Sequence, residues 1–206
     1  MPYELWAAFA VASLALLAIP GPTVLVVVSY ALGQGRQSGW TTVPAVALGD
    51  FTAMTVSLAG AGAVLAASAT LFTVLKFAGA AYLVWLGIQL WRADPSLTLP
   101  RQGLEANRRR MFWNCYVVTA LNPKGIVFFI AFVPQFVDPA LPSLPQFVVL
   151  EAIFLSLAAV NIALWAILAG ELRARFAEPR LLRRINRVGA AFLIGAGLLT
   201  AAARRA

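Results

Sequence analysis

The sequence contains no histidine and a single cysteine, Cys115. One cysteine excludes an internal disulfide and a relay of paired thiols, and the lack of histidine argues against a zinc site of the usual kind. Charged residues make up only 12% of the 206 residues, whereas 61% are hydrophobic and the mean hydropathy is +0.83. This composition is too apolar for a soluble domain of this size. It predicts an all-α membrane protein with a single transmembrane domain, residues 1–206.

Six apolar stretches are long enough, or nearly so, to cross a hydrocarbon core about 30 Å thick. We expect these transmembrane helices at about 5–32, 42–66, 71–91, 111–133, 147–170 and 188–203. The first stretch has no basic segment before it, and the prolines within it do not form a small-residue cleavage site. We therefore interpret it as a retained helix and not as a cleaved signal peptide.

The arginines predict the orientation of these helices. Twelve arginines lie in the linkers that follow the first, third and fifth stretches, including a basic linker at about 94–110. Because basic linkers remain in the cytoplasm, both termini are expected outside it. Arg204 and Arg205 oppose this arrangement and keep a five-span alternative open. The arginines that produce the net charge of +8 either fix the topology or bind anionic lipid. Their placement between apolar stretches does not favour a nucleic-acid partner.

Two parts of the chain repeat the same features at the same spacing. Pro20-Gly21-Pro22 interrupts the first apolar stretch, and Asn122-Pro123-Lys124 interrupts the fourth. Pro22 and Pro123 are 101 positions apart, and so are Asp50 and Glu151. A three-helix unit leaves the membrane on the side opposite to its entry, so a second copy must be inverted. The pattern predicts two inverted three-helix repeats, about 1–93 and 111–206, with helices one and four broken at their prolines, as in secondary transporters.

The first break predicts a binding site for a carboxylate. Pro20 and Pro22 cannot donate backbone hydrogen bonds, and Gly21 loosens the chain between them. A half-helix that begins at Thr23 would direct its N-terminal amides and partial positive charge at the break. A purely structural kink is the alternative. Asp50, which we expect at the same depth, would carry protons or bind a substrate amine, unless it only caps those amides.

Lys124 and Glu151 are the charged residues expected in the membrane-spanning part of the second repeat. Their depths allow an ion pair, which would serve either stability or gating. Lys124 could instead hold the carboxylate of a substrate. With Pro20, Gly21, Pro22, Thr23, Asp50, Asn122 and Pro123, these two residues form the predicted substrate-binding and coupling site.

Several segments resemble one family of membrane carriers. Residues 75–87, LKFAGAAYLVWLG, followed by QLWRA at 89–93, are similar to the third-helix signature of the LysE/RhtB family of amino-acid exporters. Pro20-Gly21-Pro22 resembles its first-helix motif, and the segment from Asn122 to Phe136 resembles its fourth. The resemblance covers essentially the whole chain. It implies an inner-membrane carrier that exports amino acids or their derivatives in exchange for protons, nearest the homoserine, homoserine-lactone and threonine branch.

Other functions remain as alternatives. A divalent-metal exporter would need several converging carboxylates or thiols, for which the chain offers only Asp50, Glu151 and Cys115. A membrane assembly protein is also open. No nucleophile–base pair or cofactor motif indicates an enzyme, and we expect no cofactor. The expected partners are an amino-acid substrate, protons and the lipid bilayer. The sequence does not decide which amino acid is exported, or whether the carrier is a homo-oligomer.

Overall fold

The computed structural model describes residues 3–67, 69–92, 107–138 and 140–171, with scattered positions between 184 and 202. Throughout this part of the chain the regular structure is helical. The elements, in order, are α1 (Tyr3–Ala18), α2 (Pro22–Gln34), η1 (Arg36–Ser38), α3 (Gly39–Ala67), α4 (Ala69–Arg92), α5 (Arg108–Ala120), α6 (Pro123–Ala131), η2 (Val133–Phe136) and α7 (Ser143–Glu171).

Both predicted helix breaks are present. The axis of the chain bends by 55° between α1 and α2, and by 41° between α5 and the segment that begins at Pro123. In each case a proline occupies the first turn of the second helix, where its missing N–H costs no helical hydrogen bond. The same residues end the preceding helix, because proline cannot donate to the carbonyl four residues earlier.

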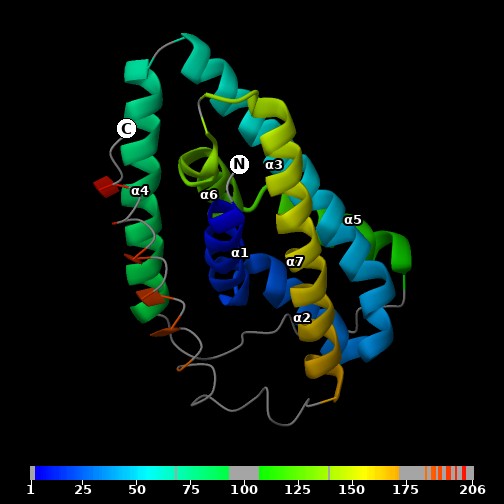
Figure 1. The fold of residues 1–206 in the computed structure, drawn as a ribbon. Helices are drawn as coiled ribbons and strands as arrows, with labels where there is room; N and C mark the ends of the chain where they lie inside the picture. Colours follow the sequence, from blue (N-terminus) through cyan, green and yellow to red (C-terminus); the bar gives the residue numbers. More distant parts are fainter. Residues whose placement is uncertain are drawn as a thin grey trace.

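The apolar interior consists of two clusters that the long helices α3 and α7 connect. The first cluster, which we call the aromatic cluster, joins α1 and α6 and centres on Phe9, Phe128 and Phe154. The second, which we call the aliphatic cluster, joins α2 and α5 through residues such as Val27 and Met111. Figure 1 shows α1 and α6 between α4 on one side and α3 and α7 on the other.

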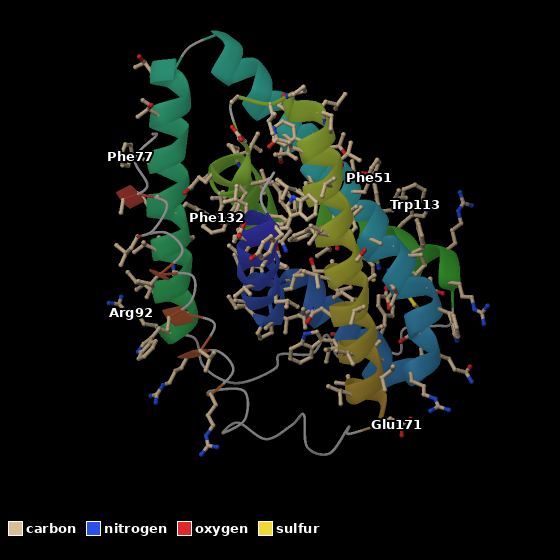
Figure 2. All side chains as sticks on the ribbon, viewed as in Figure 1. Phe51, Phe77, Arg92, Trp113, Phe132 and Glu171 are labelled. Atoms are coloured by element: carbon tan, nitrogen blue, oxygen red, sulfur yellow. The ribbon has the colours of Figure 1, made fainter. Side chains whose placement is uncertain are left out.

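The turn after α2 packs against the end of α7. Gly35 has a φ of 75°, a left-handed conformation that glycine adopts without strain. A Cβ atom on Gly170 would lie 2.6 Å from the backbone nitrogen of Arg36, so the two segments are in close contact. Arg36 also forms an ion pair of 3.2 Å with Glu171, in which both side chains are exposed. Figure 2 places Glu171 at this end of α7.

Large apolar side chains cover much of the outer surface. Phe51 on α3 and Trp113 on α5 are exposed on one side of the molecule, and Phe77 on α4 is exposed on the other (Figure 2). The helix α4 contacts α6 and α3. A surface of this kind suits hydrocarbon, which solvates apolar side chains as well as a protein interior does.

Two described helices, Arg36–Gly60 and Ser143–Glu171, are long and apolar enough to cross a membrane. If α1 with α2, and α5 with the segment from Pro123 to Phe136, each count as one bent span, the described residues contain up to four spans. The helix α4 coincides with the third expected span, 71–91. The expected sixth span, 188–203, is described only at scattered positions, and most of the basic linker, 94–110, lies outside the described residues. The inverted repeat, the six-helix count and the orientation therefore stay predictions.

Candidate functional site

The two helix breaks lie against each other. The side-chain amide of Asn122 donates to the hydroxyl oxygen of Thr23 over 3.1 Å, and the hydroxyl of Thr119 donates to the same oxygen over 3.3 Å. Asn122 also accepts a hydrogen bond of 3.1 Å from the backbone N–H of Lys124, so it caps α6. One buried asparagine thus caps its own helix and fixes the start of α2.

Lys124 crosses from the second break to the first. Its ammonium donates to the carbonyl oxygens of Leu16, over 3.1 Å, and Ile19, over 2.9 Å. Pro20 leaves the Leu16 carbonyl without its usual donor, and a helix C-terminus carries partial negative charge that favours a cation. The neighbouring carbonyl of Leu17 accepts a hydrogen bond of 3.0 Å from the amide of Asn161 on α7. The carbonyl end of α1 is therefore held by side chains of α6 and α7.

The amide end of the first break differs from the carbonyl end. Gly21, in extended conformation, is the N-cap of α2 and provides no side-chain hydrogen bond. Pro22 has no N–H, and the first helical bond runs from the Leu25 amide to the Gly21 carbonyl. The amides of Thr23 and Val24 consequently precede the first regular bond of the helix and add to its partial positive charge.

Asp50 lies beside this junction. The preceding residue, Gly49, lies so close to α5 that a Cβ atom there would be 2.8 Å from the Cβ of Thr119. The carboxylate of Asp50 is attracted by the charge of Lys124. Among the described residues the two form no direct ion pair, and no hydrogen bond reaches the Asp50 carboxylate. Asp50 therefore does not cap the amides of α2 in this conformation, which was one of the roles expected from the sequence.

Glu151 lies away from the junction. Its carboxylate accepts a hydrogen bond of 2.7 Å from the hydroxyl of Thr55 on α3, and the structure shows no ion pair between Glu151 and Lys124. On α7, Glu151 precedes Asn161 by ten residues, which corresponds to about 15 Å along the helix axis. The ion pair that the depths allowed is thus replaced by two separate contacts, Lys124 with α1 and Glu151 with α3.

The junction lies at the level where the two apolar clusters meet. On α3, Asp50 stands between Val46 of the aliphatic cluster and Ala53 of the aromatic cluster. On α7, Asn161 stands between Ala158 of the aromatic cluster and Ile162 of the aliphatic cluster. We call this level, with Thr23, Asp50, Asn122, Lys124 and Asn161, the polar layer. Glu151 lies within the stretch of α7 that belongs to the aromatic cluster.

The sequence predicts four of the five residues of the polar layer as site residues and misses Asn161, together with two residues beside the layer, Gly49 and Thr119. Asn161 belongs to no motif that identifies its partner, although an amide inside an apolar span requires one and often marks a contact between helices. The contact between Gly49 and Thr119 has a weaker signal in the sequence, namely that small residues are typical of close helix contacts in membranes. Within the described residues, no group of three or more cysteine or carboxylate side chains is placed to hold a metal ion.

Fold and site together define a helical membrane protein in which two broken helices meet in a polar layer between apolar clusters. A family model, the LysE type translocator, matches residues 14–203. The chain therefore belongs to the LysE type translocator family.

Three relatives show how similar this chain is to known membrane proteins, two of them over their full length. A homoserine/homoserine lactone efflux protein of Salmonella typhimurium is 31% identical over the whole of both chains. An uncharacterized membrane protein of Vibrio cholerae is 31% identical over 99% of this chain and all of its own. A leucine efflux protein of an Enterobacter species is 29% identical over 63% of this chain and 62% of its own. No solved structure matches the chain.

Proposed function

We propose that this protein is a secondary carrier of the inner membrane that exports amino acids or their derivatives. Family membership and the names of the relatives, which describe homoserine, homoserine-lactone and leucine efflux, support this function. The observation that carries the proposal is the polar layer, where two broken helices contact each other and the oppositely charged Asp50 and Lys124 lie between two apolar clusters. Irregular backbone within a membrane is tolerated where it is covered by protein or lines a cavity.

The start of α2 is the proposed site for the carboxylate of the substrate. Helix N-termini bind anions through free amides and partial positive charge. Here Gly21 adds no side chain at the N-cap, Pro22 and Thr23 begin the helix, and no side chain caps it. Asn122 and Pro123 hold the second break against this helix end, with Pro20 opening the first. Amino acids with small polar side chains, such as homoserine or threonine, are the proposed substrates, because the hydroxyl and amide groups of Thr23, Thr119 and Asn122 lie at this helix end.

Asp50 is the proposed coupling residue for protons. A carrier that exports against a gradient needs a group that alternates between ionised and neutral forms. The Asp50 carboxylate lies on α3 at the level of the polar layer and has no hydrogen-bond donor among the described residues. A substrate carboxylate bound nearby would repel the ionised form, so proton binding and substrate binding would influence each other. Glu151 is proposed to act at a different depth, through its contact with Thr55.

Transport into inverted membrane vesicles tests this function. Vesicles with an acidic interior are supplied in turn with L-homoserine, L-threonine and L-leucine, and uptake is compared for wild type and Asp50→Asn. We expect wild type to accumulate at least one of them, and Asp50→Asn to retain exchange of that amino acid but to lose accumulation driven by the pH gradient. Glu171→Gln, an acid-to-amide change at an exposed position, is the matched control.

Two results would contradict the proposal at different points. If wild-type vesicles transport no amino acid, the assignment as an amino-acid exporter is wrong. If Asp50→Asn accumulates substrate as well as wild type does, the carrier assignment stands, but Asp50 is not the coupling residue.

A further inference from the structure

The ammonium group of Lys124 occupies a position that suits a primary ammonium in general. Its two acceptors, the carbonyl oxygens of Leu16 and Ile19, lie 3.1 Å and 2.9 Å away. They belong to the end of α1 that Pro20 deprives of a helical donor. An ammonium has three N–H donors and no acceptor, so two carbonyls at a negative helix end are a suitable environment for it.

The contact between the Lys124 ammonium and these carbonyls depends on a flexible side chain. The lysine side chain has a flexible four-carbon stem, and its charge is not fixed to one geometry as the charge of arginine is. Gly21 lies directly beside it, since a Cβ atom there would be 3.3 Å from the ammonium nitrogen. The side chain is only partly buried. A rotation of the lysine side chain alone would therefore part the ammonium from the carbonyls, with the backbone of α6 in place.

A second candidate partner for this ammonium lies in the same layer. The Asp50 carboxylate attracts Lys124 but forms no direct ion pair with it in this conformation. It also has no hydrogen-bond donor among the described residues. The chain thus presents one ammonium, from Lys124, and two places for it: the carbonyls of α1 and the carboxylate of α3.

We propose that the ammonium of Lys124 holds the place of the substrate's own ammonium. When an amino acid binds, its ammonium takes the carbonyls of Leu16 and Ile19, and Lys124 moves to Asp50. This inference rests on the proposed function, and it extends that function by assigning the ammonium subsite. It also gives Lys124 a role different from the one expected from the sequence, in which the lysine held the substrate carboxylate.

The exchange of partners has a consequence for coupling. An ion pair between Lys124 and Asp50 requires an ionised carboxylate, so a proton on Asp50 and a substrate on the carbonyls exclude each other. Exchange of substrate for proton needs this relation. It also follows that a free ammonium on the ligand is required to release Lys124. An N-acetylated amino acid, which keeps the carboxylate but loses the charge, cannot do so.

Chemical labelling of Lys124 tests the inference in a protein of native fold. The sequence has only one other lysine, Lys76, so Lys76→Arg leaves Lys124 as the single lysine side chain. The variant, in vesicles, is treated with excess formaldehyde and a borane reductant, and methylation of the peptide that contains Lys124 is measured by mass spectrometry. The reaction is run with an amino acid that the vesicles transport, with its N-acetyl derivative, and with an equal concentration of an amine that they do not transport.

We expect the transported amino acid to raise methylation of Lys124 several-fold over the other two conditions, because it displaces the lysine from the carbonyls. A fall in methylation would show that Lys124 binds the substrate directly, and equal methylation in all conditions would make it a structural cap of α1. Either result overturns the inference. Failure of the proposed function is recognised separately, because no amino acid would then be transported by these vesicles.

Discussion

Replacing Gly49 with alanine should force α3 away from α5 at the polar layer. The new Cβ atom would lie 2.8 Å from the Cβ of Thr119 and 2.9 Å from the carbonyl oxygen of Tyr116. Non-bonded carbon atoms are most stable at about 3.5–4.0 Å, so the helices must separate by several tenths of an ångström or more. Neither obstacle can rotate away, because one is a Cβ atom and the other is backbone. Insertion of a methyl group into a closely packed interior costs about 1–3 kcal/mol.

Gly60→Ala is the matched control for this substitution. Gly60 lies on the same helix, and a Cβ atom there would have no atom within 4 Å. Alanine is favoured over glycine in a helix by up to about 1 kcal/mol, so Gly60→Ala should leave stability unchanged or raise it slightly. The two variants share this propensity gain, and the difference between them therefore isolates the steric term.

Thermal unfolding of the purified proteins in one detergent, followed by tryptophan fluorescence, measures this difference. For a chain of this size 1 kcal/mol corresponds to about 2–4 °C in Tm, so Gly49→Ala should unfold about 2–12 °C below Gly60→Ala. Equal Tm values for the two variants would refute the close contact between α3 and α5, and with it the position of Asp50 beside the junction.

Two further predictions concern the carbonyl end of α1 and the orientation of the chain. Asn161→Ala removes the donor to the Leu17 carbonyl and should lower the unfolding free energy by about 1–3 kcal/mol, measured as above; Ser156→Ala, on an exposed hydroxyl that bonds within its own helix, should not. An equal effect of both changes would contradict the role of Asn161. A reporter fused to the C-terminus should be active only in the form that works outside the cytoplasm, because twelve arginines in three linkers outweigh Arg204 and Arg205. Activity of a cytoplasmic reporter at that end would reverse the predicted topology.

The helix breaks could be predicted because their cause is local. Pro20, Pro22 and Pro123 lack an N–H wherever they stand, so the hydrogen bonds lost at each break follow from the sequence alone. The helical class followed equally directly from composition. Asp50 could be proposed as a site residue because a carboxylate inside an apolar span requires a partner or a function.

The partners of these residues could not be predicted, because they depend on how each helix is rotated about its axis. The expected depths of Lys124 and Glu151 allowed an ion pair, but the Glu151 carboxylate on α7 instead accepts a hydrogen bond from Thr55. Lys124 instead reaches across to the backbone carbonyls at the end of α1, and the type of a residue does not show which backbone carbonyls will accept a side-chain donor. Asn161 likewise contacts backbone and not a side chain, and a sequence motif does not encode such contacts.

At the first break, side chains bind the carbonyl end of α1 but not the amide end of α2, and this difference bears on the charge of the ligand. The carbonyl end of α1 is already occupied, by Lys124 on Leu16 and Ile19 and by Asn161 on Leu17. The amide end of α2 has no side-chain cap. On the proposed arrangement an anion binds at the uncapped amide end of α2, whereas a cation must replace Lys124 at the carbonyl end of α1. On the same proposal, the carboxylate of a zwitterion binds at α2 while its ammonium binds at α1. The ammonium of Lys124 is then displaced from α1 toward Asp50. A polar layer arranged in this way suits an amino acid better than it suits either a simple anion or a metal ion.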